Sequence, residues 1–239
     1  MLFRSGLSAT VADPDALRQW LVPVGATPAA LVLGQAGAAA NIRILKSVER
    51  VPWAGHSALY AIPEIYQAIG KARMTLVFVN TRSQAEIVFQ ALWTANEDGL
   101  AIALHHGSLD VGQRRKVEAA MAAGRLKAVV CTSTLDLGID WGEVDLVIHV
   151  GAPKGSSRLL QRIGRSNHRL DQASEAMLVP SNRFEVLECE AARQAARENA
   201  QDTEYPSIAK LDVLAQHVLG RDRKSTRLNS SHITISYAV

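Results

Sequence analysis

From about residue 58 onward, short apolar runs alternate with longer segments in which apolar residues recur at helical spacing. The apolar runs are unbroken, a pattern typical of strands buried on both faces of a parallel sheet. Ser83 and Glu86 fit a capping box at the start of one helical segment. The predicted strands cover residues 74–80, 100–106, 126–132, 144–150 and 175–180, and the predicted helices cover residues 57–70, 83–96, 110–124, 156–165 and 183–200. The fold class that follows is α/β, a parallel sheet with helices on both faces.

The N-terminal part of the chain has a different pattern. Asp13 and Pro14 fit the N-cap and the first position of a helix over residues 13–21, which follows a short strand-like segment. Residues 22–58 are rich in Pro, Gly and Ala, and they predict a linker with extended segments, one of them apolar at residues 42–45. A domain boundary is therefore expected in this region.

The composition is that of a soluble globular chain of one to two domains, since 48% of the 239 residues are hydrophobic and 21% are charged. No apolar run reaches the roughly 18 residues of a membrane span, and the N-terminus has no apolar signal-peptide core. We therefore expect a cytoplasmic protein. Cys131 and Cys189 are too few for a disulfide framework and lack the spacing of a zinc site, so we interpret both as buried thiols.

Residues 222–239 differ in character from the rest of the chain. Residues 211–220 predict the start of a helix, but no apolar period, cap or turn connects them to the segment that follows. Reverse-translated, residues 222–232 resemble a common short-read sequencing adapter and residues 235–239 resemble its continuation; the alternative is a short basic tail. Without this tail, which holds three cations and one anion, the net charge falls from +3 to +1. A nearly neutral chain with one basic region remains.

That basic region spans residues 146–170 and contains neither Asp nor Glu. Its spacings of four, three and four place four arginines along one helical face, and Leu159, Leu160 and Ile163 can turn toward the sheet. Cations on one face repel one another, and an arginine fork suits bidentate phosphate contacts, which together indicate an anionic ligand. The alternative is a solvated basic face. The cations are Lys154, Arg158, Arg162, Arg165 and Arg169, with His149 and His168 besides.

Four polar clusters directly follow predicted strands, where open α/β sheets build their ligand sites. Their backbone N–H groups, hydroxyls and cations suit the tracking of a phosphodiester chain, although Ser and Thr at such positions also cap helices. His105 and His106 point to opposite faces of their strand and lack Cys or carboxylate partners at ligand spacing, so no metal site is predicted. The clusters cover residues 80–82, 105–108, 132–140 and 151–155.

The order of these clusters resembles superfamily 2 helicases. The segments TLVFVNTR, HHGS, VVCTSTLDLGID and LLQRIGRSNHR are similar to motifs IV, IVa, V and VI of that superfamily, and Ser8, Ala9 and Thr10 resemble motif III. The segments GLSATVADPDAL, HHGSLD, CTSTLDLGIDWGEVD and QRIGRSNH most resemble the large-helicase-related group of DNA helicases, in its ligase-associated bacterial branch. The resemblance covers roughly residues 6–221.

This resemblance implies that the chain contains the second RecA-like domain of an ATP-dependent DNA helicase. The whole enzyme would be of the 3′–5′ type, act in DNA repair and lie in the bacterial cytoplasm. The implied parts are a remnant of the first RecA-like, ATP-binding domain (1–22), an inter-domain linker (23–57), the helicase C-terminal RecA-like domain (58–185) and a connecting helix with the start of a winged-helix domain (186–221). Residues 222–239 are the adapter-derived tail described above.

The resemblance also implies roles for particular residues. Arg165 falls on the arginine finger of motif VI, which stabilises charge on the γ-phosphate, and Arg162 and Gln161 fall on positions that link this motif to the nucleotide. Gly138 and Asp140 match nucleotide-binding positions. Nucleic-acid-binding positions are matched by Thr81, Arg82, His106, Gly107, Arg114, Thr132 and Ser133, and positions that couple the domains by Ser8, Ala9, Thr10, His168 and Arg169. Where many relatives have a second finger, this chain has His168 followed by Arg169.

Two motifs that complete such an enzyme do not occur in this sequence: the phosphate-binding GxxxxGK[ST] and the DExH segment that holds Mg²⁺. We therefore expect a first RecA-like domain in cis to hold ATP with Mg²⁺, and this chain alone to be inactive. Expected partners are single-stranded and duplex DNA and, by family resemblance, a DNA ligase and a nuclease. The alternatives are a non-catalytic nucleic-acid-binding RecA-like module, an RNA helicase, and an unrelated doubly wound protein that binds a small phosphorylated ligand.

Overall fold

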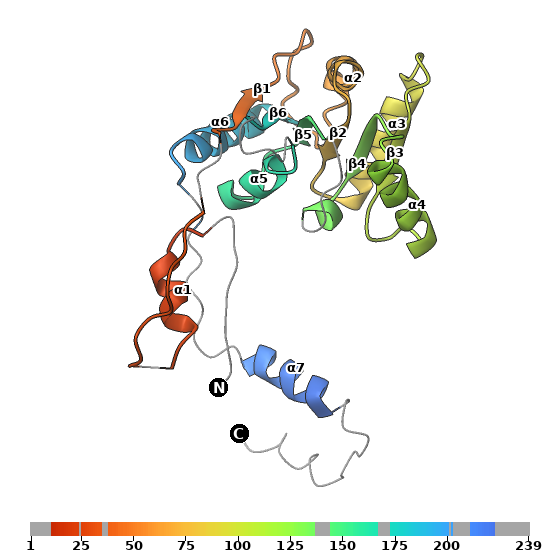
Figure 1. Ribbon diagram of the computed structural model, residues 1–239. Helices are drawn as coiled ribbons and strands as arrows, with labels where there is room; N and C mark the ends of the chain where they lie inside the picture. The colour runs from red at the N-terminus through yellow and green to blue at the C-terminus, as the bar shows by residue number, and fades with distance from the viewer. Residues whose placement is uncertain are drawn as a thin grey trace. The chain divides into compact units, whose positions relative to one another are not determined.

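The computed structural model describes residues 11–23, 25–34, 38–136, 144–166, 173–200, 202 and 211–222. The chain divides into two units, residues 1–203 and residues 204–239. The first unit contains a sheet with its helices, and the second contains one described helix, α7 (Leu211–Asp222) (Figure 1). None of the described helices is long and apolar enough to cross a membrane.

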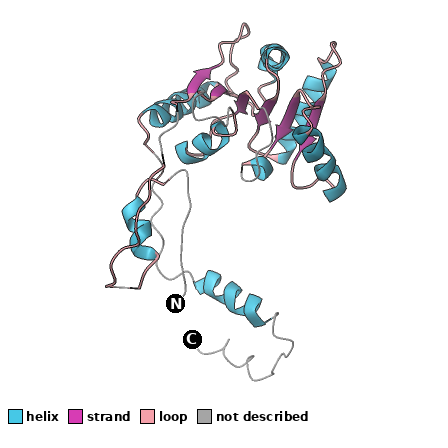
Figure 2. Cartoon of the chain, in the orientation of Figure 1, coloured by secondary structure: helices cyan, strands magenta, loops and turns pink. Residues whose placement is uncertain are grey.

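Six strands form a single sheet in the order β1-β6-β5-β2-β4-β3. Every pairing is parallel, so the carboxyl ends of all six strands lie at one edge of the sheet (Figure 2). All residues of β2, β4 and β5 are buried, as their unbroken apolar runs predict. The α/β fold class expected from the sequence is therefore confirmed. The strands are β1 (Asn41–Ile44), β2 (Thr75–Phe78), β3 (Ile102–His105), β4 (Ala128–Cys131), β5 (Leu146–Val150) and β6 (Glu175–Val179).

Strand β1 lies within the segment that the sequence assigns to a linker. It pairs with β6 from Asn41 beside Glu175 to Ile44 beside Leu178, and Ile42 is buried against the same sheet. Four residues in a Pro-, Gly- and Ala-rich stretch are too few to show a period, so only the pairing with β6 distinguishes this strand from a linker. The sheet therefore takes in residues that precede position 58.

Helices cover both faces of the sheet. Helices α2 (Ile62–Lys71) and α3 (Arg82–Thr94) pack on one face, and α4 (Val111–Ala122), α5 (Ser156–Ile163) and α6 (Arg183–Arg197) pack on the other. Strand β2 shows the division, because Val77 packs with α2 and α3 whereas its neighbour Phe78 packs with α4. Two short 3-10 helices, η1 (Leu59–Ala61) and η2 (Ser133–Leu135), precede α2 and follow β4.

Helix α3 begins closer to its strand than the sequence predicts. Its N-cap is Thr81, whose hydroxyl accepts a hydrogen bond from the Gln84 backbone N–H at 3.1 Å. The predicted capping box of Ser83 and Glu86 is therefore wrong, because position 83 already lies inside the helix and the Glu86 carboxylate binds His106 instead. The difference brings residue 82 to the first helical position, at the carboxyl edge of the sheet.

The helices outside the sheet start where the sequence predicts. Helix α1 (Pro14–Trp20) is capped by Asp13, whose carboxylate accepts from the Ala16 backbone N–H at 3.0 Å, and none of its residues is buried. Helix α7 starts at Leu211, and its apolar side chains whose burial is described, such as Leu214, are exposed. Helix α1 therefore owes its start to local signals in the sequence.

Candidate functional site

The loops that follow β2, β3, β4 and β5 meet at the carboxyl edge of the sheet. They comprise residues 79–81, 106–110, 132–136 and 151–155 among those described, and they contain the polar clusters that the sequence singles out. The parallel topology thus brings together clusters that lie up to about seventy residues apart in the chain, which is the expected geometry of an α/β ligand site.

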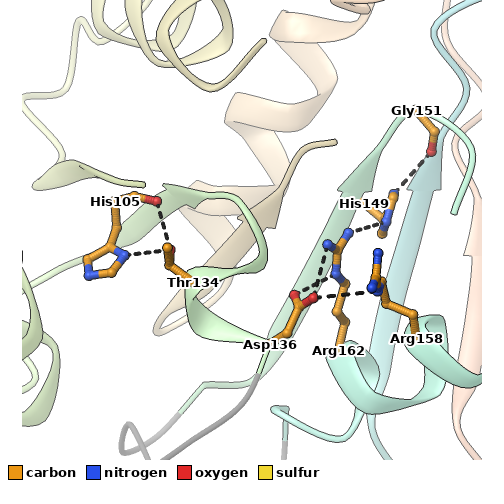
Figure 3. Close-up of polar contacts among 7 residues, drawn as sticks. All are labelled: His105, Thr134, Asp136, His149, Gly151, Arg158 and Arg162. Carbon is orange, nitrogen blue, oxygen red and sulfur yellow. Dashed lines mark hydrogen bonds and ion pairs between the residues drawn. The ribbon is translucent and has the colours of Figure 1, made fainter. Parts of the chain in front are cut away.

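Arg162 lies in the interior of the domain, on the face of α5 that packs against the sheet. Its side chain is 3% exposed, and it donates two hydrogen bonds to the Asp136 carboxylate, Nε to Oδ1 at 2.7 Å and Nη2 to Oδ2 at 3.3 Å. Its Nη1 lies 2.6 Å from His149 Nε2 (Figure 3). Its Cζ lies 4.8 Å from the centroid of the Phe78 ring. A buried charge persists only when it is paired and hydrogen-bonded in this way.

The ring of His149 completes this buried cluster. Because Arg162 can only donate, His149 Nε2 is the acceptor, and the proton lies on Nδ1, which donates to the Gly151 carbonyl oxygen at 3.1 Å. Burial and then the neighbouring Arg162 charge lower the pKa of His149 to about 3, so the ring is neutral at pH 7. The cluster therefore links α5 to the loop after β4 and to the loop after β5.

The expectation of one helical face holds for Arg158 and Arg162, which both lie against Asp136, but it is wrong for Arg165, which follows the end of α5. Arg158 is half-exposed, with its Nε 3.8 Å from Asp136 Oδ2, whereas Arg162 is buried (Figure 3). Helix α5 ends before Arg165, which is half-buried, and Arg169 lies outside the described residues. The basic segment has no acidic residue of its own, and its acidic partner comes from another loop of the fold.

The two histidines at the end of β3 turn to opposite faces of the sheet, as their adjacent positions predict. His105 Nδ1 lies 2.8 Å from Thr134 Oγ1, and its Nε2 lies 3.1 Å from Glu118 Oε1 on α4 (Figure 3 shows the first contact). His106 Nε2 lies 2.7 Å from Glu86 Oε1 on α3. Both rings are buried, and burial lowers the pKa of His105 below its ordinary value. The His106 ring is thus directed into the fold, whereas a direct contact with a nucleic-acid strand would require it to face outward.

An exposed group forms at the start of α3, where Arg82 Nη1 donates to Ser108 Oγ at 2.7 Å. Thr81, Arg82 and Gly107 are all exposed. A Cβ placed on Gly107 would lie 3.7 Å from Arg82 Nη2 and 3.8 Å from Thr134 Cγ2, so the loop backbone passes directly beside the guanidinium. Three residues that the sequence predicts as nucleic-acid contacts are therefore neighbours in the fold.

The other predicted site residues occupy varied positions. Thr132 is buried and Ser133 is exposed at the start of η2, and Gln161 is half-buried on α5. Arg114 is half-buried on α4, near enough to His105 for its charge to lower the pKa of that ring. No group of three metal-ligating side chains occurs within the described parts of the chain. The described residues do not include Ser8, Ala9, Thr10, Gly138, Asp140, His168 and Arg169.

Three members of the buried cluster had no predicted role of their own: Asp136, which falls in the cluster 132–140, His149, which falls in the basic region, and Phe78. One signal was present in the sequence, since His149 interrupts an otherwise apolar buried strand and a buried imidazole needs a hydrogen-bond partner. The sequence does not indicate which of the arginines supplies that partner. The choice of Arg162 follows from the way α5 packs on the sheet.

Residues 59–169 match the helicase conserved C-terminal domain. The chain is 41% identical over 167 residues, 69% of its length, to the ATP-dependent helicase Lhr-Core of Methanothermobacter thermautotrophicus, and 34% identical over 90% of its length to the Lhr-Core helicase of Saccharolobus solfataricus. A solved structure of Mycobacterium smegmatis helicase Lhr bound to ssDNA and AMP-PNP has a TM-score of 0.79 and 34% identity, and the match covers 89% of this chain and 28% of that one.

The parallel sheet and the motif loops at its carboxyl edge define a RecA-like C-terminal domain of a superfamily 2 helicase. Within that class, the chain is similar to the Lhr-type helicases, over up to 90% of its length. It spans 19% of the length of the Methanothermobacter relative and 25% of the Saccharolobus relative.

Proposed function

We propose that this chain acts as the second RecA-like domain of an ATP-dependent DNA helicase. The observation that carries the proposal is the buried ion pair of Arg162 and Asp136, which joins the motif VI helix to the motif V loop. Salt-bridge networks of this kind are among the links that carry coupling between two sites of a protein, here a nucleotide site and a nucleic-acid site. The relatives' names as ATP-dependent helicases, and the ssDNA and AMP-PNP in the matched Lhr structure, support the proposal.

Arg162 and Arg165 would have different roles near the nucleotide. The guanidinium of Arg162 is committed to Asp136 and His149, so we assign it the positioning of α5 rather than a direct phosphate contact. Arg165 follows the end of α5, and it would supply the arginine finger to ATP held by a first RecA-like domain. Gly138 and Asp140 would approach the nucleotide from the segment after Asp136, and Gln161 would help to orient motif VI.

The side chains of the proposed nucleotide site are suited to the phosphates of a nucleotide but not to the Mg²⁺ ion that accompanies them. Cationic side chains such as Arg158 and Arg165 suit phosphate oxygens, whereas Mg²⁺ requires carboxylate and water oxygens that the described residues do not gather in one place. ATP, when bound, would supply the free energy of hydrolysis, and its Mg²⁺ would be held by the first domain. Ser8, Ala9, Thr10, His168 and Arg169 would couple the two domains.

The nucleic-acid strand would run along the exposed part of the carboxyl edge. Arg82, Thr81, Gly107 and Ser133 are exposed there, and a cation, hydroxyls and an accessible backbone suit phosphate oxygens. His106 and Thr132 are buried and would position these loops, and half-buried Arg114 would extend the basic surface.

The finer assignments are supported by the family resemblance. They are DNA rather than RNA as substrate, 3′–5′ polarity, a role in bacterial DNA repair in the cytoplasm, and a ligase and a nuclease as partners. The same resemblance supports the division of residues 1–221 into a part of the first domain, a linker, the C-terminal domain and a connecting helix with the start of a winged-helix domain, and the likeness to an adapter supports a separate tail over residues 222–239.

The test compares the chain alone with an enzyme in which it is joined to a first RecA-like domain. In the joined enzyme, Arg165→Ala should lower DNA-stimulated ATP turnover by a factor on the order of 10³, as expected for loss of an arginine finger, and should leave DNA affinity nearly unchanged. The chain alone should show no DNA-stimulated turnover. Loss of DNA binding with intact DNA-independent hydrolysis in Arg165→Ala would contradict the assignment.

A further inference from the structure

An exposed aromatic pair lies beside the carboxyl end of β6. Trp53, in the loop before η1, is 66% exposed, and Phe184, near the start of α6, is 67% exposed. Their ring centroids are 6.5 Å apart with the planes inclined at 57°, and Arg183 Cζ lies 4.2 Å from the centroid of the Trp53 ring. The three side chains therefore form a single surface that is both aromatic and cationic, which we call the Trp53 surface.

The backbone under this surface is held firmly. The Arg183 backbone N–H donates to the Pro52 carbonyl oxygen at 2.9 Å, and Arg183 Nε donates to the Val51 carbonyl oxygen at 3.1 Å. Asn182 Nδ2 donates to the Gly55 carbonyl oxygen at 3.0 Å. These bonds fasten the loop to the start of α6 on both sides of residue 53. The tryptophan ring is thus presented outward by an ordered loop, which lowers the entropy cost of binding a ligand.

Hydrogen bonds connect the loop that holds Trp53 to the exposed edge proposed to bind the nucleic-acid strand. Gln84 Nε2 donates to the His56 carbonyl oxygen, and Gln84 Oε1 accepts from the Asn80 backbone N–H at 2.9 Å. Asn80 and Arg82 belong to the loop after β2 and the first turn of α3. The Trp53 surface therefore continues the edge on which Arg82 lies, at the end toward β6.

The chemistry of the surface fits a nucleobase. Bases stack on tryptophan and phenylalanine whatever their identity, and a guanidinium strengthens such stacking through its charge. A positive charge beside the rings also suits the phosphate that accompanies each base. We propose that Trp53, together with Arg183 and Phe184, is a stacking site for an unpaired base of single-stranded nucleic acid bound along the carboxyl edge. This inference rests on the proposed function of that edge.

The test uses the whole 239-residue chain and two fluorescein-labelled oligonucleotides of equal length, one of oligo(dT) and one with the same backbone but without bases. Trp53→Ala should weaken binding of oligo(dT) by roughly 5- to 150-fold, the effect of losing one stacked base. It should leave binding of the baseless strand and the salt dependence unchanged. Trp53→Phe should restore most of the affinity, because it keeps an aromatic face.

Two further variants separate this inference from the proposed function. Trp93→Ala removes another exposed tryptophan, on α3, and should leave both affinities unchanged. Arg82→Ala should weaken both oligonucleotides equally and reduce the salt slope by about one.

An unchanged oligo(dT) affinity in Trp53→Ala, or an equal loss on both strands, would overturn the stacking site. In either case a normal Arg82→Ala result would leave the proposed function standing. If the chain bound neither oligonucleotide, or bound both equally well without Arg82, the proposed function and the stacking site would be overturned together.

Discussion

Arg82 lies at the start of α3 and Arg162 lies on α5, and although the two side chains are chemically identical, their surroundings are opposite. Arg162 is buried and donates hydrogen bonds to Asp136 and His149, whereas Arg82 is exposed and donates to Ser108. The first guanidinium holds parts of the domain together, and the second is available to a ligand. The arginines at this edge of the sheet are thus of two kinds, and burial rather than charge separates them.

The physical reason lies in the cost of removing water. A buried guanidinium loses its hydration and persists only while the fold supplies matching acceptors, so each partner depends on the other. An exposed guanidinium keeps much of its hydration, and an external phosphate can replace that water with little penalty. The comparison therefore predicts large stability effects around residue 162 and binding effects around residue 82.

The largest expected effect is that of breaking the buried pair. Arg162→Ala should lower the free energy of unfolding by about 3–5 kcal/mol, since it leaves Asp136 buried without its partner. Urea unfolding of the chain measures this change. The matched control is Arg158→Ala, whose half-exposed side chain lies 3.8 Å from the same carboxylate and should cost no more than about 1 kcal/mol. Equal losses in the two variants would show that burial does not distinguish the arginines.

The second effect is a pH dependence from His149, whose pKa is lowered from 6.5 to about 3 by burial and by Arg162. As the pH falls from 6.5 toward 3, the unfolded chain binds a proton that the folded chain excludes. Between pH 6.5 and 3, His149 should therefore lower the free energy of unfolding by up to about 1.4 kcal/mol for each pH unit. His149→Gln should remove that component, measured as the difference between the two urea titrations. Parallel pH profiles would contradict a neutral buried ring.

The third effect concerns binding at the exposed arginine. Arg82→Ala should weaken the binding of single-stranded DNA and reduce the slope of log affinity against log salt by about one, because one phosphate contact is lost. The urea midpoint should stay that of the unchanged chain. A stability loss comparable to that of Arg162→Ala would instead make Arg82 a structural residue.

The smallest effect should come from Ser108, which accepts the hydrogen bond of Arg82. Ser108→Ala leaves the guanidinium charge in place and removes only one contact that orients it. Its DNA affinity should fall less than that of Arg82→Ala, and its salt slope should not change. Fluorescence anisotropy titrations over a range of salt concentrations measure both quantities. A reduced slope would show that the serine itself helps to neutralise a phosphate.

Much of the fold could be predicted because its signals are local. The unbroken apolar runs identified five of the six strands, and Asp13 with Pro14 marked the start of α1. The extended segment at residues 42–45 was predicted, but its pairing with the sheet as β1 was not, and neither was the cap at Thr81. Each depends on a partner whose position the local sequence does not set. For β1 that partner is β6, and at the start of α3 the choice between Thr81 and Ser83 depends on where β2 ends.

The sequence by itself determined the α/β class, the order of the motif loops and their placement at one edge, because apolar periodicity and parallel topology follow from short stretches of chain. Only the tertiary structure decided which cation is buried. Arg162 meets Asp136 from a loop 26 positions earlier and His149 from the strand before its helix, and no spacing in the basic segment announces those contacts. The pairing arises because α5 packs Leu159 and Ile163 against the sheet, and this rotation of the helix carries Arg162 inward with them.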